Sequence, residues 1–347
     1  MNLVSSAFRS SLFAVAGCVA APGVACGAES SPQAEILRID RIWAVAEHRA
    51  FTDLVRYRER WFCTFREGSK HASPDGAIRV IASDDGLAWR SVARLAEAGI
   101  DLRDPKFSVT PDGRLMIVAG GSVMEQGKYV SRQPRVYFSA DGASWTPPSK
   151  FLSPGHWLWR ATWFRGKAYG VSYLGGGGTR DPRAAFLFQS DDGVGWKQIT
   201  EFTLPNLSET TLRFLEDGEA IAFSVVVRPS ASGPSTRATG VGSSRPPYRE
   251  WSWRVVEFPG GGPNFLVLPD GRWIAATRHY GADRSTETVL AWLSRRAVEP
   301  FLTLPSGGDT IYAGLDWHEG RLWVSYYSSH EGKSAIYFAQ IRVPTRR

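Results

Sequence analysis

Short apolar segments alternate with turn residues along almost the whole chain, and the pattern repeats. Each unit holds an apolar-rich segment, a tight turn and a second such segment, as in residues 106–109 and 115–118. Two short β-patterned segments around a glycine turn predict a hairpin. Successive turns are 54, 53, 52, 53 and 49 residues apart, and they begin at Glu59, Gly113, Gly166, Gly218, Gly271 and Gly320. This period predicts a repeat fold.

A second motif, S-x-D-G-x-x-W, marks the outer half of the unit. It occurs at residues 83–89, 139–145 and 190–196, and a degenerate copy spans residues 243–253. The Asp carboxylate can accept bonds from backbone N–H groups in the turn, glycine supplies a positive φ, and the Trp packs back against the strands. These residues are therefore expected to close a hairpin and to have no catalytic role.

The three perfect copies resemble the Asp-boxes of the sialidase superfamily, one residue shorter than the commonest form, and the resemblance covers nearly the whole mature chain. Six units of four strands predict an all-β, six-bladed β-propeller over residues 29–347, a fold that leaves only short edges. After the segment 336–341 only six residues remain, so the last unit lacks a strand. We expect the N-terminal segment, about residues 35 to 40, to supply it and close the ring.

Residues 1–28 are expected to be a signal peptide. Arg9 precedes a short apolar stretch and then small residues up to Ala28, the order typical of secretory signals. The stretch is too short for a membrane span. Val15-Ala16-Gly17-Cys18 has the form of a lipoprotein box, so a lipid anchor at Cys18 is the alternative to cleavage near Ala28. We therefore predict an exported protein, periplasmic or secreted.

The charge and the cysteine content limit which ligands, metals and cofactors we expect. Without Arg9 the 41 basic residues become 40 against 34 acidic ones, a net charge of +6, which suits an acidic ligand. The basic residues are scattered, which does not favour nucleic-acid binding. Cys63 lies in an apolar segment and is expected to be buried. No Cys/His spacing typical of zinc occurs, so we predict no metal and no cofactor, and we expect a monomer.

Charged and aromatic residues gather at the strand ends that should face one end of the propeller axis. Arg, Trp, Tyr and Asn dominate, and these side chains bind sugars by fork hydrogen bonds and stacking. The candidate substrate-binding residues are Arg49, Arg66, His71, Arg103, Asp104, Trp159, Arg160, Asn264, Arg278 and Glu331.

The sialidase resemblance also implies a catalytic set. Sialidases use a Tyr nucleophile activated by a Glu, because a phenol of pKa about 10 is a weak nucleophile until its proton has an acceptor. Tyr312 and Glu209 stand at the matching places, and they are expected to meet across the axis. The acid/base is open among Glu67, Asp75, Asp53 and Asp104, with Glu67 and Asp75 in the loop that matches the family's and Glu67 preferred.

The arginine triad of sialidases is only partly matched. Arg49 corresponds to its first member, whereas Val225 and Asn264 occupy the places of the second and third. The sequence therefore predicts an exo-glycosidase that acts on a terminal acidic sugar, sialic acid or a related one. Two alternatives stay open: a non-catalytic glycan-binding propeller, or a lyase that abstracts a proton from a uronate with Tyr and His.

Overall fold

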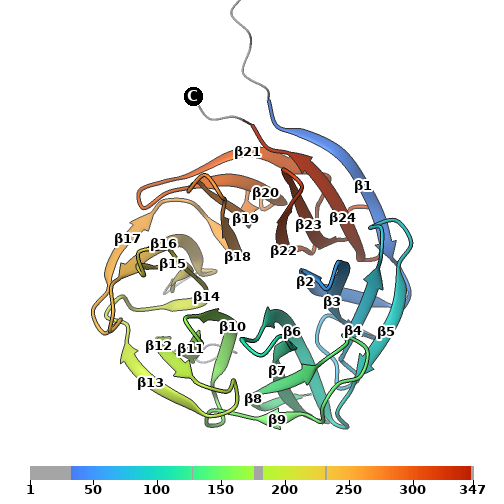
Figure 1. Cartoon of the computed structure of the whole chain (residues 1–347), viewed down its shortest axis with the longest axis horizontal. Helices are drawn as coiled ribbons and strands as arrows, with labels where there is room; N and C mark the ends of the chain where they lie inside the picture. The colour runs from blue at the N-terminus through green and yellow to red at the C-terminus, as the bar shows by residue number, and fades with distance from the viewer. Residues whose placement is uncertain (1–32, 127, 176–182, 231–232, 345–347) are drawn as a thin grey trace, which may run out of the picture.

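The computed structural model describes residues 33–126, 128–175, 183–230 and 233–344. The described chain forms antiparallel strands grouped in six four-stranded sheets, which stand as blades around a central axis (Figure 1). The predicted six-bladed β-propeller is therefore confirmed. No helix in these ranges is long and apolar enough to cross a membrane. The expected signal segment 1–28 lies outside the described residues.

Five blades each use four consecutive strands, the first innermost. Blade one holds β2 (His48–Tyr57), β3 (Arg60–Gly68), β4 (Ala77–Ser83) and β5 (Arg90–Leu95). Blade two holds β6 (Ile100–Val109), β7 (Leu115–Glu125), β8 (Lys128–Ser139) and β9 (Ser149–Lys150). Blade three holds β10 (Trp157–Phe164), β11 (Lys167–Leu174), β12 (Ala184–Ser190) and β13 (Trp196–Glu201).

The second half of the ring repeats this order. Blade four holds β14 (Leu207–Phe214), β15 (Ala220–Arg228), β16 (Thr236–Ser244) and β17 (Ser252–Val256). Blade five holds β18 (Gly260–Val267), β19 (Trp273–Tyr280), β20 (Thr286–Leu293) and β21 (Val298–Leu304). Blade six holds β22 (Thr310–His318), β23 (Arg321–Ser328) and β24 (Ala335–Arg342), with β1 (Glu35–Trp43) as its outer strand.

The N-terminal strand closes the ring. β1 pairs antiparallel with β24, with Ile36 opposite Ile341 and Ile39 opposite Ala339. Figure 1 shows the blue N-terminal strand lying along the red C-terminal one. The expected closure is confirmed, and its physical reason is that it gives β24 the partner that the end of the chain does not supply.

Apolar side chains fill the spaces between neighbouring blades. One cluster joins Ile274 and Leu290 of blade five to Leu322 and Val324 of blade six. Cys63 is fully buried in another such cluster, and burial raises the pKa of its thiol well above the usual value. Its apolar role is thus confirmed.

The S-x-D-G-x-x-W turns close the outer hairpins as predicted. In the first copy, Asp85 Oδ1 accepts the N–H groups of Leu87 and Ala88 at 2.8 and 3.0 Å. Gly86 has a φ of 73°, and the indole of Trp89 donates to its carbonyl. The degenerate copy keeps this last bond, because Tyr248 adopts a φ of 62° and its carbonyl accepts from Trp251 at 3.0 Å.

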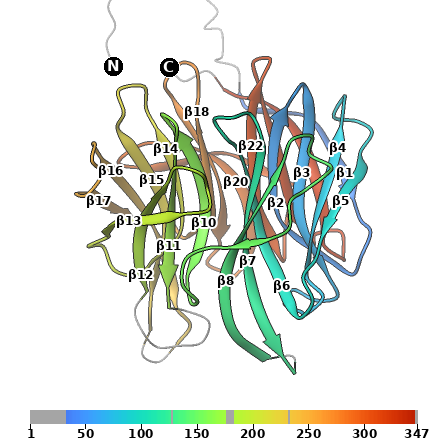
Figure 2. The same ribbon diagram turned by 60° about the horizontal axis from the view of Figure 1, so that its bottom comes forward.

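Chain direction separates the two ends of the propeller. All six innermost strands start at one end and run to the first hairpin turn at the other (Figure 2). The starts of β2, β6, β10, β14, β18 and β22 therefore surround the axis at one end, which we call the axial end. The Asp-box turns lie at the opposite end, as their position between third and fourth strands requires.

Trp145→Ala should destabilise the fold without changing the chemistry at the axial end. The indole stacks on Phe107 with ring centroids 6.4 Å apart and donates to Gly142 at 3.2 Å. Because the side chain is half-buried, we expect a loss of about 2 kcal/mol in the free energy of unfolding, measured by urea denaturation. Trp145→Phe, which keeps a ring, should lose less. Equal stability of Trp145→Ala and the parent would contradict the role assigned to this motif.

Candidate active site

Every innermost strand carries a β-bulge near its start. The pairing register shifts between Ala50 and Asp53, Arg103 and Lys106, Leu158 and Ala161, Leu207 and Thr210, Gly261 and Asn264, and Ile311 and Gly314. A bulge bends its strand and re-aims the side chains of the unpaired residues. The six bulges contain the residues that meet at the axial end, namely Phe51, Asp104, Trp159, Glu209, Gly262 and Tyr312.

Tyr312 and Glu209 meet across the axis. The Tyr312 hydroxyl donates to Glu209 Oε1 at 2.6 Å, although the residues are 103 positions apart. They belong to blades six and four, which are separated by blade five. Glu209 Oε2 accepts the N–H of Gly262 at 2.8 Å. Both carboxylate oxygens are thus held, and one of them is aligned to receive the phenolic proton.

Gly262 gives Tyr312 the space for this bond. It has a φ of 60°. A Cβ atom at this position would lie 3.2 Å from the ring of Tyr312 and 3.1 Å from the side chain of Ile311. The glycine therefore permits a close approach that a side chain would obstruct.

Tyr312 is neutral in this environment. Burial is the main cause that raises its pKa well above the ordinary value, and the charges of Glu209 and Asp104 add to the rise. Trp159 lies 5.2 Å from the Tyr312 ring, Phe51 lies 5.1 Å from it, and Tyr327 stacks on it at 6.1 Å. The ring is thus fixed by aromatic packing, while its hydroxyl faces a carboxylate.

Asp104 is a buried carboxyl group beside this pair. It adopts a φ of 49° within its bulge, the residue is 8% exposed, and its Oδ1 has no hydrogen-bond partner among the described residues. Burial raises its pKa, and Glu209 adds to the effect, while Arg103 and Lys106 oppose it. A carboxyl group whose pKa is raised by an apolar setting can stay protonated and act as a general acid.

Lys106 is a buried cation that the sequence analysis overlooked. Its ammonium donates to the Thr52 carbonyl at 2.9 Å and lies 5.4 Å from the Tyr312 ring and 5.1 Å from the Trp159 ring. Burial lowers its pKa to about 8. Phe107 and Val109 follow Lys106, so the sequence pattern presents it as part of an apolar segment. A lysine two residues after a strand-end Asp was the available signal.

Arg278 completes the cations around Tyr312. Its guanidinium donates to the Thr310 carbonyl at 2.9 and 2.6 Å and to the Tyr327 hydroxyl at 3.2 Å, and its carbon lies 5.7 Å from the Tyr312 ring. We call Tyr312, Glu209, Asp104, Lys106 and Arg278 the axial cluster.

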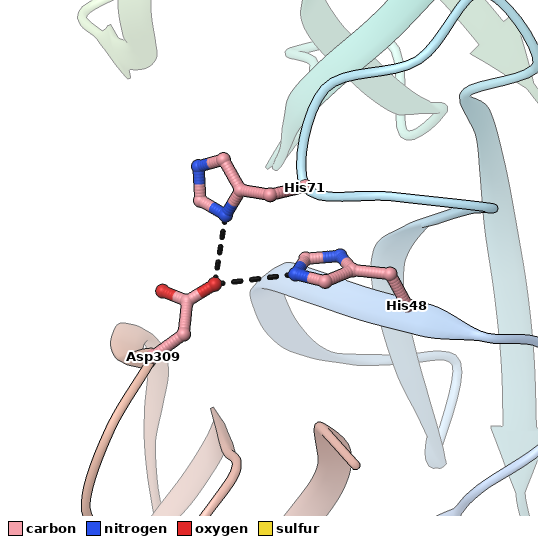
Figure 3. Close-up of side chains that lie close together, drawn as sticks. All are labelled: His48, His71 and Asp309. Atoms are coloured by element: carbon pink, nitrogen blue, oxygen red, sulfur yellow. Dashed lines mark hydrogen bonds and ion pairs between the residues drawn. The ribbon is translucent and has the colours of Figure 1, made fainter.

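Beside the axial cluster, two histidines converge on one carboxylate (Figure 3). Asp309 Oδ2 lies 2.7 Å from His71 Nδ1 and 3.2 Å from His48 Nε2. Arg103 donates to the His71 carbonyl at 3.0 Å and covers the ring of Phe51 at 4.8 Å. The structure thus places the predicted residues His71 and Arg103 at the axial end, with two partners that the sequence analysis did not name.

Four residues named as candidates, Arg160, Asp53, Trp159 and Asn264, form the packing of the axis. Arg160 of blade three makes a bidentate ion pair with Asp53 of blade one, at 2.7 and 3.0 Å. Trp159 donates to the Pro263 carbonyl of blade five. Asn264 accepts from Arg213 and donates to the Ala313 carbonyl. Because their polar groups bind other parts of the chain, these residues hold the blades together around the site.

Glu67 and Asp75 lie apart from Tyr312. Glu67 accepts bonds from Trp43 and Arg79 at 2.7 and 2.8 Å, and Asp75 accepts from Ser69. Both carboxylates line a separate small cavity of about 360 Å³. Of the acid/base candidates, Asp104 is the one whose charge acts on Tyr312, whereas the contacts of Glu67 and Asp75 are with other residues.

Three further candidates bind within the fold away from the axial cluster. The guanidinium of Arg49 donates to the carbonyls of Ala44 and Ala46. Arg66 is fully buried and pairs with Asp101 at 2.6 Å. Glu331 accepts from Arg41 and Tyr337. Counting positions along a strand gave the correct end of the propeller for these residues but not the direction of their side chains.

A wide cavity lies at the opposite end of the propeller. It measures about 1190 Å³ and is lined by residues of the hairpin turns of blades four and five, together with Trp273 and Trp292 of blade five and Trp317 of blade six. This cavity is at the other end of the propeller from Tyr312. The axial end is the candidate site because of the polar contacts made there.

No protein-family model matches this chain, and no characterised protein matches its sequence. Solved structures do match its fold. A protein of unknown function from Dyadobacter fermentans is similar over 90% of this chain and 100% of its own, with a TM-score of 0.75 and 17% identity.

Two named glycosidases also match. Trypanosoma rangeli sialidase has a TM-score of 0.66 and 13% identity over 85% of this chain, which spans 55% of the sialidase. An α-L-arabinofuranosidase of Fusarium graminearum has a TM-score of 0.63 and 14% identity over 84% of this chain and 92% of its own. The sialidase was also solved as a covalent intermediate with 2,3-difluorosialic acid, at 12% identity. At these identities the likeness establishes the shared propeller fold.

Lys106→Met should remove a pH dependence of stability. The pKa of Lys106 falls from 10.5 to about 8 on folding, so between these values the unfolded chain binds a proton that the folded chain lacks. Stability of the parent therefore rises with pH across this window, by on the order of 3 kcal/mol at most. Urea denaturation between pH 7 and 9.5 should show that the free energy of unfolding rises more with pH in the parent than in Lys106→Met. Parallel profiles would contradict the assignment.

Proposed function

We propose that this protein is a retaining glycoside hydrolase of the sialidase type, which releases a terminal acidic sugar from a glycan. The observation that carries the proposal is the 2.6 Å bond from Tyr312 to Glu209 across the axis. A tyrosine becomes nucleophilic when an adjacent carboxylate can take its proton. The fold supports the proposal, since a sialidase and an arabinofuranosidase share it.

The proposed reaction has two steps. In the first, the Tyr312 oxygen attacks the anomeric carbon while its proton passes to Glu209. Asp104 donates a proton to the leaving glycosidic oxygen, and a covalent glycosyl-tyrosine remains. In the second, water attacks the anomeric carbon and gives a proton to Asp104. The Tyr312 oxygen leaves and recovers its proton from Glu209, so that both carboxyl groups return to their starting state.

Charge supports an acidic substrate. Arg278, Arg103 and Lys106 place three cations around the site, and only Lys106 is fully buried. A substrate carboxylate near Arg278 would gain a charge-assisted bond. Because Arg49 and Asn264 are bound within the fold, an arginine triad of the sialidase kind is not formed by these positions. We therefore favour an acidic sugar related to sialic acid, handled by an exported enzyme.

Tyr312→Phe should abolish turnover and leave the fold intact. The phenyl ring keeps its contacts with Trp159 and Phe51 but has no oxygen to attack, so we expect kcat to fall by on the order of 10³-fold or more. Hydrolysis is measured as reducing sugar released from a panel of acidic glycans. Tyr326→Phe is the matched control, because the Tyr326 hydroxyl binds the Pro305 carbonyl away from the cluster.

The products also decide between the alternatives. Full activity of Tyr312→Phe would transfer the nucleophile role to another group. An unsaturated uronate that absorbs in the ultraviolet would show a lyase, and binding without any product would show a glycan-binding propeller. A 2-fluorosugar that leaves a covalent adduct on the parent, and none on Tyr312→Phe, would support the glycosyl-tyrosine directly.

Asp104→Asn should separate the two chemical roles. Without a general acid, hydrolysis of natural glycosides should fall by roughly 10²–10⁴-fold, whereas an aryl glycoside whose leaving group needs no proton should lose far less in the first step. The loss of activity at high pH, where Asp104 ionises in the parent, should disappear in the variant. Asp112→Asn, in a turn at the opposite end, is the control. Equal losses on both substrates would contradict the acid role.

A further inference from the structure

Two of the six histidines of the chain point at the same oxygen of Asp309, from three separate segments. His48 begins β2, His71 follows β3 in a loop, and Asp309 immediately precedes β22. Their three facing atoms, His48 Nε2, His71 Nδ1 and an Asp309 oxygen, all lie within 4.8 Å of one another (Figure 3). We propose that these residues bind one divalent transition metal ion.

The ligand types select the class of metal. Two imidazoles and one carboxylate suit zinc and the neighbouring transition metals, whereas calcium and magnesium prefer sites made of oxygen alone. Two histidines with one carboxylate are also the protein ligands of several zinc enzymes, which keep a further position open. Three protein ligands would therefore leave a fourth coordination position for water or for an oxygen of a sugar.

Neighbouring groups already orient the carboxylate. Asp309 Oδ1 accepts a hydrogen bond from the Tyr327 hydroxyl at 2.8 Å, and the backbone N–H of Asp309 donates to Ser329 Oγ at 2.9 Å. Oδ2 is thereby left for the histidines. Hydrogen bonds of this kind to a metal-binding carboxylate fix its direction and raise metal affinity. His48 Nδ1 is buried and has no partner among the residues that the structure describes, and the contact of this ring with Asp309 is made through Nε2.

Metal binding requires both histidines to change tautomer. His48 Nε2 faces a carboxylate oxygen, which only accepts, so a metal at Nε2 moves its proton to Nδ1. His71 Nε2 lies 3.3 Å from Arg103 Nη2, which makes Nε2 an acceptor and leaves the proton on Nδ1. A metal at Nδ1 moves that proton to Nε2, so this one bond is lost while Arg103 keeps its bond to the His71 carbonyl at 3.0 Å. Ligand atoms around zinc at 2.0–2.1 Å lie about 3.4 Å apart. His71 can make this adjustment, because its side chain is 54% exposed and lies on a loop.

The site adjoins the axial cluster. Tyr327 contacts Asp309 through its hydroxyl and stacks on Tyr312. An ion here would add positive charge beside Arg278, and its open position would take an oxygen of an anionic ligand. The metal site itself holds whether or not Tyr312 is a nucleophile.

The test is a metal titration of the full-length protein, with any affinity tag removed and metal stripped by a chelator. Calorimetry with Zn²⁺ should give one site per chain, and Co²⁺ should produce visible absorption typical of bound imidazole. His71→Ala and Asp309→Asn should each weaken Zn²⁺ binding by at least roughly 100-fold. His71→Ala is the safer variant for folding, since its side chain is half-exposed.

His279→Ala is the matched control. His279 lies 3.5 Å from Glu287 but has no third ligand among the described residues, so its loss should leave the Zn²⁺ affinity unchanged. Tyr312→Phe should also keep the metal, which separates this inference from the proposed hydrolysis. Absence of Zn²⁺ and Co²⁺ binding by the parent, or equal affinity in folded His71→Ala and Asp309→Asn, would overturn the metal site and leave the role of Tyr312 untouched.

Discussion

Closure of the ring by β1 and β24 is the constraint on which the rest of the structure depends. The pairing joins residues near the two ends of the described chain, with Glu35 opposite Arg342. Once blade six is complete, β22 stands beside both β18 and β2, and its first residues face the axis. The Tyr312–Glu209 bond, the Trp159–Tyr312 contact and the Asp53–Arg160 ion pair all join blades that are not neighbours. Such contacts can form only inside a closed ring.

The axial end gathers charged groups because all six innermost strands bulge there. Bulges interrupt the ladder and present side chains where a regular strand would present backbone. The consequence is electrostatic, because Asp104 and Lys106 are buried together and the pKa of each shifts toward its neutral form. Keeping both groups away from water is costly, which is a sign of a functional site. The opposite end has the Asp-box turns. Their carboxylates are exposed and accept hydrogen bonds from backbone N–H groups of the same turn, so they stabilise only that turn.

The same crowding brings the axial cluster and the His48–His71–Asp309 cluster together at one end. Tyr327 bridges them, since its ring stacks on Tyr312 and its hydroxyl binds Asp309. Arg278 bonds to Tyr327 and lies 3.7 Å from Asp309. A change in charge at the His48–His71–Asp309 cluster would therefore act on Tyr312 through Tyr327 and Arg278.

The sequence by itself determined the repeat, the six blades, the closing strand and the end of the axis at which Tyr312 and Glu209 lie. These follow from local patterns, because turn residues and apolar alternation act within a few positions of the chain. Only the tertiary structure decided which side chains reach the axis. Arg49, Glu67 and Glu331 have the right phase but turn toward other partners, whereas Lys106, His48 and Asp309 were overlooked. The physical reason is that spacing places a residue at one end of the propeller but does not set its partners. Arg49 and Glu67 pair in the regular ladder outside the bulge of β2, and His48 and Asp309, 261 residues apart, meet only when the ring closes.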